Sequence, residues 1–320
     1  MKKPMWKVLI AVLIFAVAAA GMVFAAGQQE EAPAAEAEME KEVTIVYVGF
    51  ATSNTFWNRL GAMARSQAED MGIKFLDLTP PEPSPSEQKK AVDNAILQKV
   101  DGIIIGAADN RAFGESLDKA KAAGIPVIAV DTGIDHEQVM SLVQTDNLKS
   151  ARIAGDYIVK NMKKPGKVLI LGGTLGHQTG NARRDGVKQV AEENGIEVIF
   201  RACDWDESKA FETAQNELAA NPDITAIFSA WDPGAMSAKA VVKEKGLLDD
   251  IIIVGFDGNP ANLKAIKAGE IEATIKQDND KMGKDSVSIL YKIIKGEMVD
   301  DFYPIDGFVI DKNNVDKYLD

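Results

Sequence analysis

The stretch Ile251-Ile252-Ile253-Val254-Gly255-Phe256-Asp257-Gly258 places the tightest constraint on what this chain can fold into. A short β-branched run that ends in an acid and a glycine is typical of a fully buried strand in a parallel sheet. The stretch from Pro126 to Gly133 repeats this pattern, with Asp131 as its acid. Ligands of open α/β sheets bind beyond the carboxyl ends of the strands. We therefore predict a cleft that carries one carboxylate on each side.

Strand-like and helix-like segments alternate along the rest of the chain, which predicts parallel sheets with helices on both faces. More strands are expected than one open sheet usually holds, and the pattern restarts near Asp146, so two similar α/β domains are predicted. Strands are expected at 43–50, 73–78, 102–106, 127–130, 139–144, 168–171, 196–201, 224–229, 251–256, 272–275 and 302–310. Helices are expected at 55–71, 86–99, 112–123, from the cap at 145–147 to 162, and at 181–194, 207–220, 234–245, 261–268, 280–295 and 313–319.

Residues 1–26 have the features of a cleavable signal peptide. Lysines near the start precede a short apolar core, and Ala25 or Ala26 completes a small-residue cleavage site. An uncleaved membrane anchor is the alternative, because the apolar run is nearly long enough to span a bilayer. Residues 27–42 are rich in Ala and Glu and are predicted to form a disordered tether. We therefore expect a periplasmic protein that is exported and is soluble after cleavage.

Composition argues against several other classes of protein. The formal net charge of −12 disfavours a nucleic-acid partner, because phosphate contacts need clustered Lys and Arg. The only cysteine, Cys203, allows no internal disulfide and no zinc cluster, and it is predicted to be a small buried apolar residue. The two histidines, His136 and His177, have no partners at metal-binding spacings. We predict no metal, no cofactor and no catalytic residue.

Three of the four tryptophans, Trp57, Trp205 and Trp231, fall in predicted strand-to-helix turns. Structural tryptophans usually lie inside the periodic elements, so this placement favours a binding role. A sugar or polyol needs charged and amide partners for its hydroxyls and flat aromatic walls for its C–H faces.

The acids that follow strands have two possible roles. Asp131 and Asp257 either contact a ligand or cap a helix and brace its turn. Asp109 and Asp232, which follow the neighbouring strands, are predicted to be helix caps.

A series of motifs extends over nearly the whole chain from Val43. The motifs are Asn54-Thr55-Phe56-Trp57, Gly124 to Asp131, Asp146-Asn147 with Ala154 to Ile158, Arg183 to Gly186, Asn221-Pro222-Asp223, Val254 to Gly258, and Gly269 with Ala273 to Ile275 and Gln277. Their order and spacing resemble the ribose-binding-protein-like branch of the type I periplasmic binding proteins.

That resemblance implies an α/β fold with two Rossmann-like lobes joined by a three-crossover hinge. The expected lobes are 43–145 with 278–305, and 146–277 with 306–320. It also implies a monomer that closes on a small sugar or polyol and delivers it to an ABC permease in the inner membrane. The ligand contacts implied by the family motif are Asn54, Phe56, Trp57, Asp131, Arg183, Trp205, Trp231, Asp257 and Gln277.

Two residues depart from the pattern of ribose binders. Thr132 stands where they carry a large cation, and Trp231 stands where they carry an asparagine. Both changes remove a polar side chain that could hydrogen-bond a sugar hydroxyl, so we expect that D-ribose is not the best ligand. The alternative is that Trp231 points away and Asp232 takes over the contact.

Two other functions remain open at this level. One is a ligand sensor presented to a membrane chemoreceptor or sensor kinase, which uses the same closed form as a transport protein. The other is a sugar-modifying enzyme. The segment Gly172-Gly173-Thr174-Leu175-Gly176 fits neither a dinucleotide fingerprint nor a phosphate-binding loop, and no Ser/His/Asp or Cys/His pattern is present.

Overall fold

The computed structural model describes residues 42–319. The predicted signal peptide and the tether, apart from its last residue, lie outside the described residues. Within 42–319, no helix has both the length and the apolar character needed to cross a bilayer.

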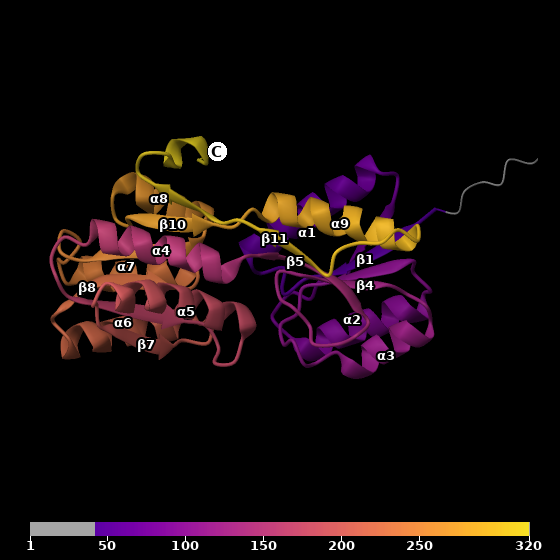
Figure 1. Cartoon of the computed structure of the whole chain (residues 1–320), viewed down its shortest axis with the longest axis horizontal. Helices are drawn as coiled ribbons and strands as arrows, with labels where there is room; N and C mark the ends of the chain where they lie inside the picture. The colour runs from indigo at the N-terminus through magenta and orange to yellow at the C-terminus, as the bar shows by residue number, and fades with distance from the viewer. Residues whose placement is uncertain (1–41, 320) are drawn as a thin grey trace, which may run out of the picture. The chain divides into compact units, whose positions relative to one another are not determined.

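The first lobe is built on a parallel sheet with the strand order β11-β5-β4-β3-β1-β2. Its strands are β1 (Thr44–Val48), β2 (Lys74–Asp77), β3 (Gly102–Ile105), β4 (Val127–Val130), β5 (Val139–Thr145) and β11 (Phe302–Ile305). Figure 1 shows helices on both faces of this sheet. They are α1 (Thr55–Asp70) with α9 (Asn279–Ile294), and α2 (Pro85–Leu97) with α3 (Gly114–Ala122).

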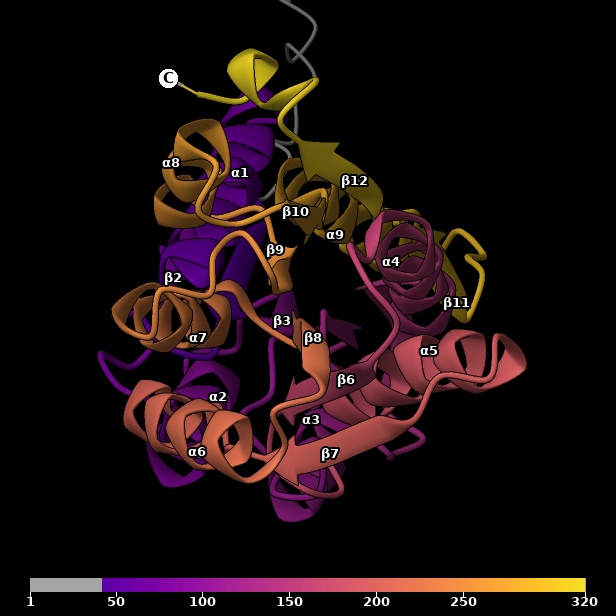
Figure 2. The ribbon, with the colours of Figure 1, turned by 90° about the vertical axis from the view of Figure 1, so that its left-hand side faces the viewer.

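The second lobe repeats this arrangement with the order β12-β10-β9-β8-β6-β7, in which only β12 runs antiparallel to its neighbour. Its strands are β6 (Lys167–Gly172), β7 (Val198–Ala202), β8 (Ile224–Ser229), β9 (Ile252–Asp257), β10 (Ala273–Lys276) and β12 (Phe308–Asp311). Figure 2 shows its helices on the two sides of the sheet. They are α4 (Asn147–Asn161) with α5 (Gln178–Glu193), and α6 (Glu207–Ala220) with α7 (Asp232–Glu244) and α8 (Pro260–Ala268).

The central strands are buried along their whole length, which explains why their sequences are continuous apolar runs. All residues of β3, β4 and β8 are buried. Helices cover both faces of each sheet, so most side chains on both faces are apolar. Full burial of one Val or Ile side chain contributes about 1.5–3 kcal/mol to folding.

Side-chain caps fix the beginning of several helices at the carboxyl ends of strands. Asn54, Ser84, Asp146, Asp206 and Asp278 each accept a hydrogen bond from a backbone N–H of the first helical turn. Such a cap typically contributes about 1 kcal/mol. The caps therefore hold the turns that follow the strands in defined positions.

The chain passes between the two lobes three times: between β5 and α4, between β10 and α9, and between β11 and β12. Hydrogen bonds join these crossovers to one another. The Asp146 N–H donates to the Ile305 carbonyl (2.9 Å), and the Thr145 hydroxyl donates to Gln277 Oε1 (2.7 Å). The fold is thus α/β with two Rossmann-like lobes and a three-crossover hinge.

Some predicted elements are wrong at the C-terminal end. The single strand expected at 302–310 is two strands in different sheets, because the chain leaves the first lobe at Asp306 and Gly307. The helix expected at 313–319 is only a 3₁₀ turn at Val315–Lys317. Asn314 is not a helix cap: its amide donates to the Val309 carbonyl and its oxygen accepts from the Asp311 N–H, which forms a turn instead.

Candidate functional site

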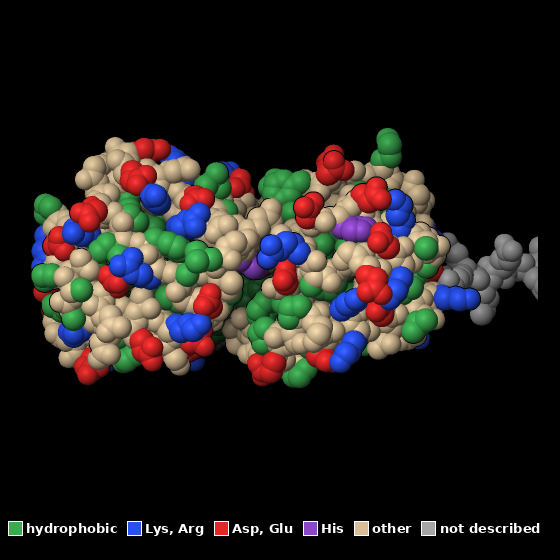
Figure 3. Space-filling model, turned by 90° about the horizontal axis from the view of Figure 1, so that it is seen from below, with side chains coloured by type: hydrophobic (Ala, Val, Ile, Leu, Met, Phe, Trp, Pro, Cys, Tyr) green, Lys and Arg blue, Asp and Glu red, His purple; other side chains and the backbone are tan. Residues whose placement is uncertain are grey.

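A cavity of about 870 Å³ lies between the carboxyl ends of the two sheets, with walls from both lobes. Figure 3 shows the two lobes meeting at a narrow waist, with charges of both signs scattered over their surfaces. All nine residues named from the sequence line this cavity: Asn54, Phe56, Trp57, Asp131, Arg183, Trp205, Trp231, Asp257 and Gln277.

Aromatic side chains form the cavity wall of the first lobe. Phe50 stacks on Trp57 with ring centroids 6.0 Å apart, and Phe56 meets Trp57 edge to face at 5.5 Å. Asn54 caps α1 through its side-chain oxygen, which accepts from the Phe56 N–H at 2.9 Å. The Asn54 amide nitrogen therefore remains the group that can donate into the cavity.

A second aromatic wall comes from the other lobe. Trp205 meets His177 and Trp231 edge to face, with centroids 5.5 and 5.6 Å apart. Trp231 lines the cavity and is buried to all but 6% of its surface. A Cβ at Gly173 would lie 2.1 Å from the Trp205 ring, so only glycine permits this ring position.

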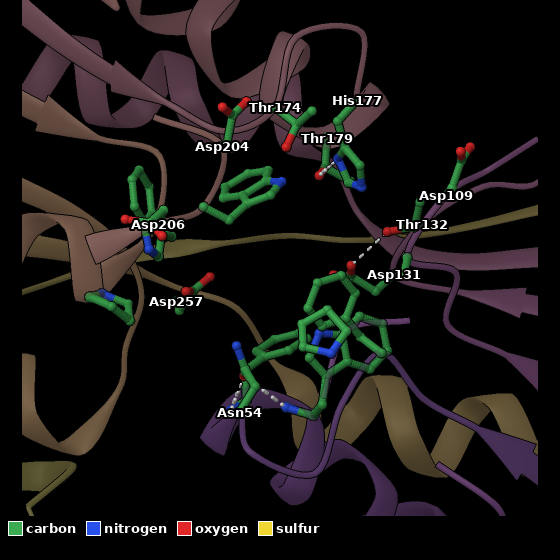
Figure 4. Close-up of a pocket in the computed structure, with 18 of the residues that line it drawn as sticks. Asn54, Asp109, Asp131, Thr132, Thr174, His177, Thr179, Asp204, Asp206 and Asp257 are labelled. Atoms are coloured by element: carbon green, nitrogen blue, oxygen red, sulfur yellow. Dashed lines mark hydrogen bonds between the residues drawn. The ribbon is translucent and has the colours of Figure 1, made fainter. Parts of the chain in front are cut away.

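Asp131 projects into the cavity from the end of β4 (Figure 4). Its Oδ2 accepts a hydrogen bond from the Thr132 hydroxyl at 3.1 Å. Its Oδ1 is buried, and no donor among residues 42–319 reaches it. Burial raises the pKa of Asp131 from 3.8 to about 6, against the opposing effect of the Arg183 charge. This oxygen is therefore a buried acceptor without a donor among the described residues.

Asp257, Arg183 and Gln277 form a polar network opposite Asp131. Asp257 Oδ1 accepts from Gln277 Nε2 at 2.7 Å and from Arg183 Nη1 at 3.5 Å. Gln277 also accepts from Thr145 in the hinge, so the network joins the cavity to a crossover. Burial raises the pKa of Asp257, while Arg183 and Gln277 oppose that shift.

The Arg183 guanidinium is held rigidly and is buried to all but 4% of its surface. Nε donates to Asn147 Oδ1 at 2.8 Å, Nη1 donates to the Ala230 carbonyl at 2.9 Å, and the Phe256 ring lies 4.0 Å below the guanidinium carbon. Among the described residues, no acceptor takes a hydrogen bond from Nη2. Nη2 thus presents donors to the cavity at a fixed position.

The predictions for Asp109 and Asp232 as helix caps are wrong. Asp232 is the first residue of α7, and its buried carboxylate accepts from the Asn259 N–H, the Asn262 amide and the Thr274 hydroxyl. It fastens neighbouring strand ends together and is not among the residues that line the cavity, so it does not replace Trp231 there. The Asp109 carboxylate accepts from the Arg111 N–H within a turn, ahead of α3.

Other residues of the cavity were not predicted. Phe50 could have been found, because it lies two residues after the end of β1. His177 and Thr179 are joined by a hydrogen bond at 3.0 Å, and burial lowers the pKa of His177 to about 4. The sequence shows only that His177 has no partner at a metal-binding spacing, and it does not reveal that the ring packs against Trp205. Cys203 is buried, as predicted.

Within residues 42–319, no group of three or more His, Cys, Asp or Glu side chains could hold a metal ion.

The geometry defines a class of protein: a two-lobed α/β receptor with a polar, aromatic-walled cavity at the strand ends. The family model for the periplasmic binding protein domain matches residues 45–298. The chain is 32% identical to the ribose import binding protein of Salmonella typhimurium, over 82% of this chain and 88% of that protein. It is 25% identical to the D-allose-binding periplasmic protein of Escherichia coli, over 81% and 88% of the two chains.

Solved structures agree with these relatives. An ABC transporter periplasmic solute-binding protein from Actinobacillus succinogenes with bound D-allose has a TM-score of 0.82 and 27% identity, over 87% of this chain and all of that chain. One from Bacillus halodurans with bound myo-inositol has a TM-score of 0.78 and 26% identity, over 87% and 96%. The chain belongs to the periplasmic binding protein family, in its ribose-binding-protein-like type I branch. Members of this family are binding proteins rather than enzymes.

Proposed function

We propose that this chain is an exported solute-binding protein that captures a small sugar or polyol between its lobes and delivers it to an ABC permease. One observation carries the proposal. A fixed guanidinium and two buried carboxylates face a single cavity between two aromatic walls. Relatives whose names specify ribose or allose support a carbohydrate as the ligand.

The free groups of the cavity suit a polyhydroxyl ligand. Asp131 Oδ1 and the Asp257 carboxylate accept from hydroxyls, and Arg183 Nη2 and the Asn54 amide donate to them. Hydrogen bonds to a charged partner are about twice as strong as neutral ones. The aromatic walls cover the C–H faces of the ligand: Trp57 with Phe50 and Phe56 on one lobe, and Trp205 with Trp231 on the other. We propose the nine lining residues named above as the ligand contacts.

The proposal extends to the organisation of the protein. We propose a cleaved signal at 1–26, a tether at 27–42, and lobes of 43–145 with 278–305 and of 146–277 with 306–320. Release into the periplasm as a soluble monomer would let the protein diffuse to a permease in the inner membrane. Closure of the lobes draws its free energy from tighter binding of the ligand to the closed form.

The test is a thermal-shift screen of the purified mature protein against pentoses, hexoses, polyols and inositols. A ligand at a hundredfold excess over its dissociation constant stabilises the fold by about 2.7 kcal/mol. We expect at least one monosaccharide-sized compound to raise the melting temperature. The Asp257→Asn variant should lose that shift. No shift with any carbohydrate, or an equal shift in the variant, would contradict the proposed function.

A further inference from the structure

The charges buried in the cavity do not balance. Asp131, Asp257 and Arg183 line it, and the side chains of all three are almost entirely buried. Figure 4 shows Asp131 and Asp257 approaching from opposite lobes. Their charges interact, since Asp257 contributes to the raised pKa of Asp131. The two carboxylates therefore share the Arg183 charge, and the Lys276 charge acts on Asp257 as well.

The guanidinium is committed to the second lobe. Its hydrogen bonds go to Asn147, to the Ala230 carbonyl and to Asp257, and Phe256 packs beneath it. Its hydrogen-bonded carboxylate partner is therefore Asp257, while its charge also acts on Asp131 without a direct ion pair. In the described part of the chain, no side chain forms an ion pair with Asp131.

Among the described residues, the only side chain that hydrogen-bonds Asp131 is neutral. The Thr132 hydroxyl bonds Oδ2, whereas Oδ1 is buried without a donor. A hydroxyl supplies a hydrogen bond but no charge, and an uncompensated charge in a dry site is costly. Closure around a neutral ligand would bury this charge further. Asp131 thus has no cation in direct contact within residues 42–319.

The charged side chains at the rim of the cavity are also mostly acidic. Five further acids line it, against one basic side chain, Arg111: they are Glu82, Asp109, Asp204, Asp206 and Glu207. Arg111 lies 3.8 Å from the Asp109 carboxylate and Lys209 lies 2.8 Å from the Asp204 carboxylate, so among the described residues Glu82, Asp206 and Glu207 are the rim acids without an ion pair. The rim therefore repels anionic sugars and attracts cations, an effect that salt screens.

We infer that the preferred ligand is a sugar or polyol that carries one amino group, whose ammonium lies against Asp131 while its hydroxyls reach Asp257 and Arg183. This inference rests on the proposed function of the same cavity. It gives the Asp131 carboxylate a charged partner, which no side chain among residues 42–319 supplies. It also explains how Thr132 can occupy this position without leaving a charge unpaired in the bound state.

The test compares matched pairs of ligands by calorimetric titration at pH 6.5, where an aliphatic amine is protonated. The pairs are D-glucosamine with D-glucose, D-galactosamine with D-galactose, and 1-amino-1-deoxysorbitol with sorbitol. In at least one pair, the amine should bind 10-fold tighter or more. Asp131→Asn should abolish that preference. Glu297→Gln, at an exposed acid that does not line the cavity, should change it less than about 3-fold.

The outcomes separate the two claims. If neutral members bind as well as the amines or better in every pair, the inference is wrong and the proposed function stands. If a preference for the amine survives in Asp131→Asn, the assignment of the ammonium to Asp131 is wrong. If no carbohydrate binds in either form, both claims fail.

Discussion

At the scale of single residues, the cavity is where the backbone departs most from ordinary geometry. Asp131 and Trp205 have φ angles of 63° and 60°, and Asp257 has a φ of 126°. Positive φ is costly for residues with a Cβ and persists where the surrounding structure enforces it. At Asp131 the backbone N–H donates to the Val143 carbonyl and the carbonyl accepts from Gln144, which holds the strained turn.

This strain makes Asn the right replacement for Asp131, because Asn tolerates positive φ better than Ala. The pKa of Asp131 is raised from 3.8 to about 6, so the folded state holds its proton at pH values where the unfolded state has lost it. Stability therefore falls as the pH rises from about 4 to about 6 and stays low above that range, by about 3 kcal/mol.

We predict that Asp131→Asn melts roughly 5 °C higher than the wild type at pH 8 and gains little at pH 4. Thermal melts of the ligand-free protein across this range measure the effect. Glu297→Gln, at an exposed acid, is the control and should follow the wild-type profile. A parallel pH profile for Asp131→Asn would show that this carboxylate is not desolvated.

A second prediction at this scale concerns Trp231. An indole offers a single N–H and no acceptor, and here its ring packs on Trp205 at the cavity wall. A hydroxyl placed against it loses hydration without a partner. We predict that the best compound of the screen displaces D-ribose in a competition titration. Tighter binding of ribose, or unchanged affinities in Trp231→Ala, would refute this role.

The sequence predicted which residues line the cavity better than it predicted which residues they contact. Asp131, Trp231 and Asp257 could be found because each lies at or just after the end of a buried strand. The roles of Asp232 and His177 could not be found, because they depend on contacts with residues far along the chain, such as Thr274 for Asp232. Burial of Arg183 beneath Asp257 likewise follows from the packing of α5 against the second sheet.

At the scale of elements, glycines at strand ends allow the aromatic walls to form. Gly106 follows β3, and a Cβ there would lie 2.1 Å from the Trp57 ring. We predict that Gly106→Ala pushes the indole toward the cavity, which destabilises the fold by about 1–3 kcal/mol and weakens ligand binding at least 10-fold. Melts and titrations measure the two effects.

Gly114→Ala is the matched control for this prediction. It lies in the same lobe at the start of α3, and nothing within 4 Å would meet its added Cβ. It should bind like the wild type and be equally or slightly more stable, since Ala favours helix. Equal behaviour of the two variants would mean that Gly106 does not position Trp57.

Most elements could be predicted because burial on both faces gives continuous apolar strands, and caps mark the helix starts. The exceptions have physical reasons. Residues 302–310 were predicted to form one strand. The two halves pair with different sheets, but the only local sign of this in the sequence is the dipeptide Asp306-Gly307. Helix α5 begins at Gln178, three residues before the predicted start. Its cap residue, His177, makes no side-chain capping hydrogen bond, so the sequence contains no capping motif that marks this start.

At the scale of the whole molecule, the three crossovers join the lobes, and the Thr145 to Gln277 bond links them to Asp257. We predict that a saturating ligand reduces the radius of gyration in small-angle scattering, because the lobes close around it. Asp257→Asn at the same ligand concentration should contract less. No contraction at saturation would indicate a rigid receptor.

The most direct test of the central claim is a calorimetric titration of the wild type and of Asp257→Asn with the best carbohydrate of the screen. We predict one site per chain in the wild type. Loss of a buried charged hydrogen bond costs about 2–5 kcal/mol, so the variant should bind at least 30-fold more weakly while its circular dichroism spectrum is unchanged. Equal affinity in the two proteins would contradict the assignment of this cavity as the carbohydrate site.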